Sequence, residues 1–368
     1  MSQINSPKEK ISPTQITAAS SLDEILIFAR QEKASDVHLS TDKPISLRQF
    51  SKLKNITSDS LSAKQTYSLV VSALSPEILK RFETSGDTEY IYTIAGHGRF
   101  RMALMKQHDG WDLTARLIPM EIPKFENTNI PPACAKLTKW SQGLVLISGP
   151  AGCGKTTTLA VLIEMINQNR SDHIITIEKP IEIIYEPKQC QITQREVNTH
   201  TLSQDNALRA ALREDPDILV VSELRDLQAV QLAISAAETG HLVFGTMNTV
   251  NATQTISRVI DSFPSEEQPI IRKMISESLR GVICQQLIPK KDGSGLVAAY
   301  EILIVNPSIA NLIREGRINQ INNAIATGKT FGMTLMDTSL QHLIADGTVS
   351  KEEASQHATN PSMMMQLE

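Results

Sequence analysis

The chain has 368 residues and a formal net charge of −4 at pH 7. This length allows two domains with a full α/β core, and the excess of acid excludes a global positive field for nucleic acid or anionic lipid. The four cysteines form no C-x-x-C pair, which argues against structural zinc and favours a reduced setting. Without a bilayer-length apolar run or a signal-like start, we expect a cytoplasmic protein that meets membranes only through partners.

The first part of the chain predicts a small α+β domain behind a flexible tail. Residues 1–19 are rich in Ser, Pro, Thr, Lys and Gln, a composition typical of a flexible N-terminal tail. Two capping boxes, Ser21 with Glu24 and Ser62 with Gln65, predict helix starts. Alternating polar and apolar segments predict strands at 36–40, 88–94, 98–104 and 114–118. Helices among strands indicate an α+β domain over residues 20–118.

A proline-rich segment at residues 119–132 predicts a semi-rigid linker, because proline fixes φ and keeps the preceding residue out of a helix. Beyond it, strands alternate with helices, the pattern of a doubly wound parallel sheet. We expect the second domain to cover residues 133–350, with a mostly helical part from about 251 onward and a loose C-terminal tail at 351–368. Its strands are expected at 144–147, 173–178, 218–221 and 241–246.

The segment GPAGCGKT at residues 149–156 lies between a predicted strand and a predicted helix. This is G-x-x-x-x-G-K-T in the context that a phosphate-binding loop requires, which a chance glycine turn would lack. Backbone N–H groups can surround the phosphates there, and the helix N-terminus favours their negative charge. We expect Lys155 to reach the β and γ phosphates and the Thr156 hydroxyl to bind Mg²⁺. The predicted ATP-binding residues of the loop are Gly149, Pro150, Ala151, Gly152, Cys153, Gly154, Lys155, Thr156 and Thr157.

Two acids, Glu178 and Glu223, close predicted strands of this domain. Ligand groups of such sheets lie at the carboxyl ends of the strands. A single acid at a strand end is more often a solvated residue, but two acids after a phosphate loop favour phosphoryl-transfer chemistry. We assign Glu223 as the base that activates water, and Glu178 as an acid that either lies on the metal side or supports the metal's ligands. The sequence alone leaves these two roles open to exchange.

Arginines are the candidates for charge stabilisation in the transition state. Arg99, Arg101 and Arg116 lie on predicted strands of the first domain, where they either face water or reach a nucleotide of a neighbouring domain or subunit as arginine fingers. The second interpretation implies an oligomer with nucleotide at its interfaces. The second domain offers further candidates at Arg209, Arg213, Arg225 and Arg258.

Further short motifs follow one another along the chain. They are ASDVHLS at 34–40, ITIEKPIE at 175–182, TQREV at 193–197, ALREDPDILVVSELRD at 211–226, AAETGHLVFGTMNT at 236–249 and SIANLIREG at 308–316. Together with the phosphate loop they resemble the secretion ATPases, and within them the type IV pilus retraction ATPases of the PilT/PilU type. The resemblance covers about residues 34 to 343, almost the whole chain.

The resemblance implies a hexameric ring whose subunits join a PAS-like N-terminal domain to a RecA-like ATPase core. ATP and Mg²⁺ would bind between them, with Arg99, Arg101 and Arg116 completing the site and with His241 and Asn248 of the histidine box as nucleotide ligands. Such rings dock at the cytoplasmic face of an inner-membrane platform protein and drive pilus retraction for twitching motility. Assembly-type relatives usually carry a longer N-terminal region and a tetracysteine motif, and the lack of both here favours retraction.

Four positions depart from the family pattern: Lys179 replaces an acid, Ser222 a glycine, Asn248 a histidine and Ala310 an arginine. With the core residues intact we expect a working but slower ATPase. Lys179 and Asn248 favour the alternative, a degenerate paralogue that binds ATP and regulates or co-assembles with an active motor. An ATPase of another secretion system is a further alternative. A nucleic-acid motor is opposed by the acidic composition and by the lack of a basic, aromatic-rich stretch.

Overall fold

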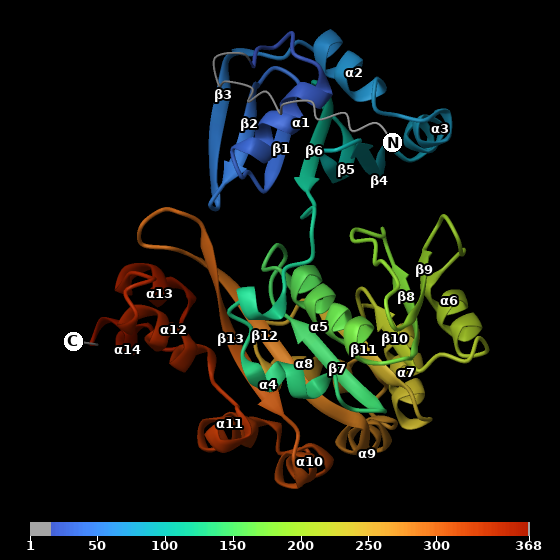
Figure 1. The fold of residues 1–368 in the computed structure, drawn as a ribbon, viewed down its shortest axis with the longest axis vertical. Helices are drawn as coiled ribbons and strands as arrows, with labels where there is room; N and C mark the ends of the chain where they lie inside the picture. Colours follow the sequence, from blue (N-terminus) through green and yellow to red (C-terminus); the bar gives the residue numbers. More distant parts are fainter. Residues whose placement is uncertain (1–15, 367–368) are drawn as a thin grey trace, which may run out of the picture. The chain divides into compact units, whose positions relative to one another are not determined.

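The computed structural model describes residues 16–366, and its internal contacts divide the chain into two units between Glu121 and Ile122 (Figure 1). Most of the predicted N-terminal tail, residues 1–15 of 1–19, lies outside the described residues. Of the rest, Ile16 is 5% exposed and belongs to the core of the first unit. The prediction of a loose tail is therefore wrong at Ile16, because one apolar side chain is enough to attach the segment to a core.

The first unit is the predicted α+β domain, with more elements than the sequence indicated. Both capping boxes are confirmed, at the first and second helices. The third helix and the second and third strands were not predicted. The third strand was missed because it is polar, mostly exposed and without a clear alternation of polar and apolar residues. The elements are α1 (Leu22–Gln31), β1 (Asp36–Ser40), β2 (Pro44–Gln49), β3 (Lys52–Ser60), α2 (Ala63–Val71), α3 (Pro76–Ser85), β4 (Asp87–Ile94), β5 (Gly98–Gln107) and β6 (Gly110–Leu117).

The six strands form one antiparallel sheet in the order β3-β2-β1-β6-β5-β4. Side chains alternate between its two faces. Phe100 and Met102 of β5 are fully buried and share a hydrophobic cluster with residues of all three helices. Arg99 and Arg101 alternate with them, so these arginines lie on the opposite face, together with Arg116 in register with Arg101.

The second unit contains the predicted doubly wound sheet, in the order β13-β12-β7-β11-β10-β8-β9. All neighbours are parallel except β12 and β13. The strands are β7 (Gly143–Ser148), β8 (His173–Glu178), β9 (Gln191–Glu196), β10 (Ile218–Val221), β11 (Leu242–Met247), β12 (Leu279–Pro289) and β13 (Leu296–Ile304). The helices before and among them are α4 (Pro132–Leu137), α5 (Lys155–Asn169), α6 (Gln204–Ala211), α7 (Leu227–Glu238), α8 (Ala252–Asp261) and α9 (Gln268–Ser278). Those after β13 are α10 (Pro307–Arg314), α11 (Ile321–Thr327), α12 (Met336–Ala345), α13 (Lys351–His357) and α14 (Pro361–Met365).

Strands β12 and β13 lie in a part of the chain that the sequence predicted as mostly helical, so that prediction is wrong there. Both strands have long fully buried runs. A continuous apolar run cannot be distinguished from a buried helix by periodicity alone. The pairing of β12 with β7 brings residues near 285 beside the phosphate loop, although more than a hundred residues separate them in sequence.

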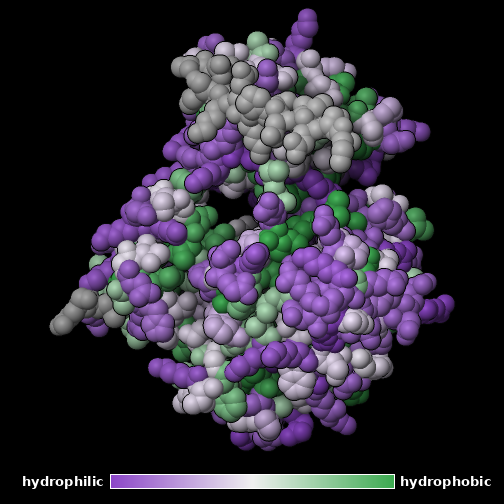
Figure 2. Space-filling view, viewed as in Figure 1, coloured by the Kyte–Doolittle hydropathy of each residue, from purple (hydrophilic) through white to green (hydrophobic). Residues whose placement is uncertain are grey.

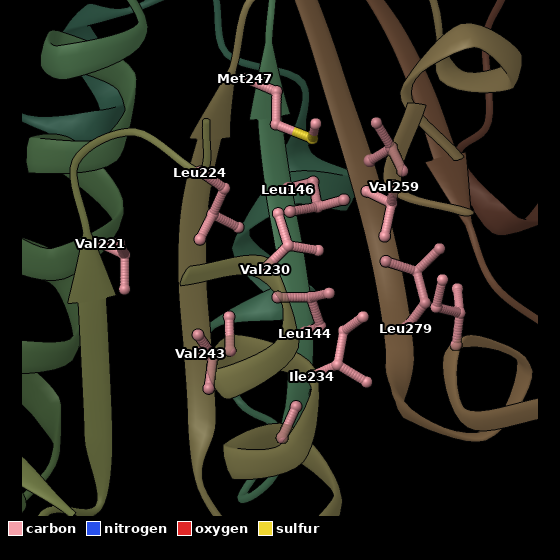
Figure 3. Packing of buried hydrophobic residues seen from close by; sticks show 14 of the residues in the cluster. Leu144, Leu146, Val221, Leu224, Val230, Ile234, Val243, Met247, Val259 and Leu279 are labelled. Carbon is pink, nitrogen blue, oxygen red and sulfur yellow. The ribbon is translucent and has the colours of Figure 1, made fainter. Parts of the chain in front are cut away.

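A hydrophobic layer supports one face of this sheet (Figure 3). Leu146 of β7 and Met247 of β11 lie side by side there, with Leu224 from the segment after β10. Each is at most 4% exposed. Truncating such a side chain to alanine costs about 2–5 kcal/mol. This packing fixes the ends of β7, β10 and β11, from which the residues of the candidate site project.

The C-terminal residues do not form the loose tail that the sequence predicted for 351–368. Through residue 366 they form α13 and α14, and Ala354 and Met364 are both fully buried in a cluster with β12 and α12. The Asp337 carboxylate accepts hydrogen bonds from the backbone N–H of Thr359 at 2.7 Å and of Asn360 at 3.0 Å. These helices are too short to show a clear sequence periodicity, and tertiary packing stabilises them.

Hydrophilic residues cover much of the second unit's surface on the face shown in Figure 2. Within residues 16–366, no helix has the length and apolar composition that crossing a bilayer requires.

Candidate nucleotide-binding site

The predicted phosphate loop joins β7 to α5 and has the backbone that its glycines allow. Gly149, Gly152 and Gly154 have φ values of 145°, 78° and 90°, a region that side chains disfavour. A Cβ atom at Gly149 would lie 2.3 Å from the carbonyl oxygen of Gln285, so only glycine fits there. The helix that follows has no side-chain cap, which leaves its first N–H groups available to an anion.

Lys155 lies at the first position of α5 and bends back over the loop. Its Nζ donates hydrogen bonds to the carbonyl oxygens of Gly149 at 2.7 Å and Pro150 at 3.0 Å. Burial lowers the pKa of the Lys155 ammonium, while Cys153 and the Glu223 carboxylate act in the opposite direction. Phosphate oxygens in the loop would give this ammonium a charged partner in place of two neutral carbonyls.

Glu178, the last residue of β8, is 9% exposed and firmly held. One carboxylate oxygen accepts hydrogen bonds from the Thr176 hydroxyl at 2.6 Å and from Nε2 of Gln194 at 3.0 Å. Glu178 lines a cavity of about 30 Å³ together with Thr156 and Ser222. Mg²⁺ prefers oxygen ligands from hydroxyls, carboxylates and water. The cavity supplies the first two and is large enough for a water molecule, so these residues fit that ion.

Glu223 has a more open environment than Glu178. Its Oε1 accepts hydrogen bonds from Nδ2 of Asn248 at 2.6 Å and from Nη2 of Arg225 at 3.2 Å. Its side chain is 38% exposed. Glu223, Arg225, Asn248 and Arg258 line a hollow of about 330 Å³, which is large enough for water and a phosphate group. The arrangement suits a carboxylate that takes a proton from water.

His241 does not join these residues. It precedes β11, and its carbonyl oxygen accepts a hydrogen bond from the backbone N–H of Gly143, at the start of β7. The phosphate loop follows the other end of β7, and a strand of six residues spans about 20 Å. His241 therefore lies at the edge of the sheet away from this chain's own phosphate loop, and its predicted role as a nucleotide ligand remains a prediction. The eight residues from His241 to Asn248 cross the sheet, so these two side chains lie at opposite edges.

Of the three candidate arginines in the first unit, Arg101 and Arg116 each pair with an acid of that unit. Nη2 of Arg101 lies 2.9 Å from Glu89, and Nε of Arg116 lies 2.9 Å from Asp36. Arg99 has interactions as well. Their predicted contact with a nucleotide remains a prediction.

Residues of β12 support the loop, and no sequence pattern pointed to them. Gln285 is 2% exposed and donates a hydrogen bond through Nε2 to the carbonyl oxygen of Cys153. The neighbouring Cys284 accepts a hydrogen bond from the Ser148 hydroxyl at 3.0 Å, and Ser148 accepts one from Thr255 of α8 at 3.2 Å. Nothing in the local sequence distinguishes this glutamine from a residue of a buried helix.

The other departures from the family pattern fit the structure without strain. Lys179 is exposed, so its charge is solvated. Ser222 does not have a positive φ, and its backbone N–H donates to the carbonyl oxygen of Ile177 at 3.0 Å. Ala310 lies within α10.

Comparisons with known proteins agree with this geometry. The model of the Type II/IV secretion system protein family matches residues 14–366. The chain is 43% identical to the type IV pilus retraction ATPase PilT of Pseudomonas aeruginosa, covering 92% of this chain and 98% of the relative. It is 41% identical to a twitching motility protein of Neisseria gonorrhoeae, covering 86% and 85%.

Among solved structures, the pilus retraction motor PilT with bound ADP matches with a TM-score of 0.82 and 38% identity, over 95% of this chain and 100% of that chain. The phosphate loop, the two strand-end acids and these matches lead to one conclusion. The chain belongs to the Type II/IV secretion system protein family.

Proposed function

We propose that this chain is an ATP-hydrolysing motor subunit of the pilus retraction kind. The observation that carries the proposal is the meeting of three groups at one edge of the sheet: the phosphate loop after β7, Glu178 beside Thr156, and Glu223 over an open hollow. The names of the two relatives, a retraction ATPase and a twitching motility protein, support the same function.

In this mechanism the loop N–H groups and Lys155 bind the β and γ phosphates. Thr156 and Glu178 would hold Mg²⁺, which neutralises phosphate charge when it is bound. Glu223 accepts a proton from water as the water oxygen bonds to the γ-phosphorus. The bond between that phosphorus and the β–γ bridging oxygen breaks, which gives ADP and phosphate.

The assembly belongs to the same proposal. A homo-hexamer, with or without a paralogous subunit, would bring Arg99, Arg101 and Arg116 toward a nucleotide, where their guanidinium groups would stabilise the transition state. The motor would act in the cytoplasm, on a platform protein of the inner membrane.

One observation favours a second candidate function. The side chain of Asn248 has no ionisable group and bonds to Glu223 in this structure. An ATP-binding subunit with little turnover, which regulates an active partner, would tolerate this replacement of histidine.

The deciding experiment is Mg²⁺-dependent ATP turnover by the purified chain, with Lys155→Ala as the blank and EDTA as the metal control. We expect turnover that both controls abolish. ATP binding without turnover above the blank would instead identify the regulatory subunit. Expression in a bacterium that lacks its own retraction ATPase then tests pilus retraction. The wild-type chain is expected to restore twitching motility, and Lys155→Ala is not.

A further inference from the structure

The Glu223 carboxylate is held asymmetrically. Its Oε1 accepts both hydrogen bonds that the structure gives this side chain, from Asn248 at 2.6 Å and from Arg225 at 3.2 Å. Within residues 16–366, Oε2 has no hydrogen-bond partner. One oxygen is therefore fixed by donors, while the other is available to take a proton.

Asn248 is the better placed of the two donors. The Arg225 side chain is 72% exposed, and an exposed pair of charges contributes little. The Asn248 amide makes the shorter bond. Because Asn248 follows the last residue of β11 directly, its position depends on the sheet itself rather than on a long loop.

The backbone around the pair is rigid. Strands β10 and β11 are parallel neighbours, and the backbone N–H of Leu224 donates to the carbonyl oxygen of Thr246 at 2.8 Å. The Thr246 hydroxyl donates to the carbonyl oxygen of Ser222. On the other side of Asn248, the hydroxyls of Thr249 and Thr255 lie 2.7 Å apart. Both residues of the pair are thus fixed within one hydrogen-bonded frame.

We infer that Asn248 is a positioning residue that orients Glu223 through Oε1, so that Oε2 receives the proton of the attacking water. This inference rests on the proposed ATPase function and replaces the sequence-based expectation that Asn248 binds phosphate. Asn248 acts through Glu223 and does not itself touch the reacting atoms.

The kinetic test separates positioning from phosphate binding. Asn248→Ala is expected to lower kcat about 10- to 100-fold, the effect of losing a charge-assisted hydrogen bond. The dissociation constants of ATP and ADP should stay unchanged, because neither nucleotide loses a contact. Asn248→His keeps an N–H donor and is expected to restore most of kcat. Asn322→Ala is the matched control, the same change on an exposed position of α11.

A second measurement detects the bond without any turnover. The unfolding midpoint of the nucleotide-free protein is measured for wild type, Asn248→Ala, Glu223→Ala and the double variant. Asn248→Ala is expected to lower the midpoint by about 2 °C when Glu223 is present and by less than half of that when it is absent.

The outcomes are distinguishable. If ATP turnover by the wild-type protein does not exceed that of Lys155→Ala, both the proposed function and the inference are overturned. Turnover in wild type with no coupling between the two positions overturns the inference alone. A weaker affinity for ATP with an unchanged kcat in Asn248→Ala makes Asn248 a phosphate ligand, and a raised kcat makes it a brake on Glu223. Either result contradicts the positioning role.

Discussion

The two edges of the seven-stranded sheet use polar side chains in different ways. At the carboxyl edge, side chains bond to side chains: Asn248 to Glu223, and Gln194 to Glu178. At the amino edge, they bond mainly to backbone. There Asp217 accepts a hydrogen bond from the backbone N–H of His173 at 2.8 Å, and Nδ1 of His241 lies 3.0 Å from the carbonyl oxygen of Ala236.

This difference indicates what each edge does. A side chain that satisfies backbone groups closes a strand or a helix, and its loss costs stability. Side chains that bond to one another around a cavity orient the groups that face a ligand there. Substitutions at the carboxyl edge should therefore change turnover, except at side chains that bond to backbone groups. Substitutions at the amino edge should leave turnover unchanged.

The largest effect is expected from Glu223→Gln. The amide keeps the size and an oxygen acceptor but cannot take a proton from water, so kcat should fall about 10²- to 10³-fold. ATP affinity, measured by equilibrium binding, should stay within about twofold. If Glu178→Gln stops turnover and Glu223→Gln does not, the roles of the two acids are exchanged.

Glu301 tests the exception at the carboxyl edge. This buried carboxylate of β13 accepts hydrogen bonds from the backbone N–H of Ala252 at 2.7 Å and of Met336 at 3.4 Å, at the starts of α8 and α12. Glu301→Leu leaves both N–H groups unpaired and should lower the free energy of unfolding by about 2–4 kcal/mol. Chemical denaturation measures this loss, and an unchanged stability would contradict the capping role.

Gln285 should give an intermediate effect, because it contacts the loop and not the nucleotide. Gln285→Leu removes the donor to the carbonyl oxygen of Cys153 and should weaken ATP binding about tenfold, the effect of one hydrogen bond. Isothermal titration with ATP measures it. Gln168→Leu, a glutamine at the far end of α5, is the matched control. Equal affinity in both variants would mean that the loop keeps its shape without Gln285.

The pH dependence of stability gives a smaller effect with a definite sign. Burial raises the pKa of Glu301 above its usual 4.5. At a pH between the pKa of Glu301 in the unfolded protein and its higher pKa in the folded protein, the folded state binds more protons than the unfolded state. The contribution of Glu301 to stability is therefore complete below about pH 4.5 and is lost as the pH rises through the pKa of the folded state. Relative to Glu301→Gln, wild type should lose at most about 1.4 kcal/mol per pH unit there. Denaturation of both proteins from pH 4 upward tests it, and parallel curves would contradict it.

The sequence predicted those parts of the site that depend on neighbours in the chain. The phosphate loop and both capping boxes are local patterns, and the alternation of strands and helices gives the parallel sheet, whose carboxyl edge carries Glu178 and Glu223. Gln285 was missed because its place beside the loop depends on the pairing of β12 with β7, which no local pattern encodes. His241 was expected as a nucleotide ligand only through the family resemblance, whereas the strand predicted at 241–246 already places it at the amino edge of the sheet.

His241 should give the smallest effect and is the sharpest test of the two edges. Because a carbonyl oxygen can only accept, Nδ1 of His241 donates to Ala236, and this bond ties the end of α7 to the start of β11. His241→Ala should cost about 1 kcal/mol of stability and change kcat and ATP affinity less than about twofold. Turnover and binding are measured beside Asn248→Ala, at the other end of the same strand. A tenfold loss of turnover in His241→Ala, with the fold intact, would mean that the amino edge takes part in catalysis, for instance through contact with a nucleotide bound by another subunit, and would contradict the division of roles between the two edges.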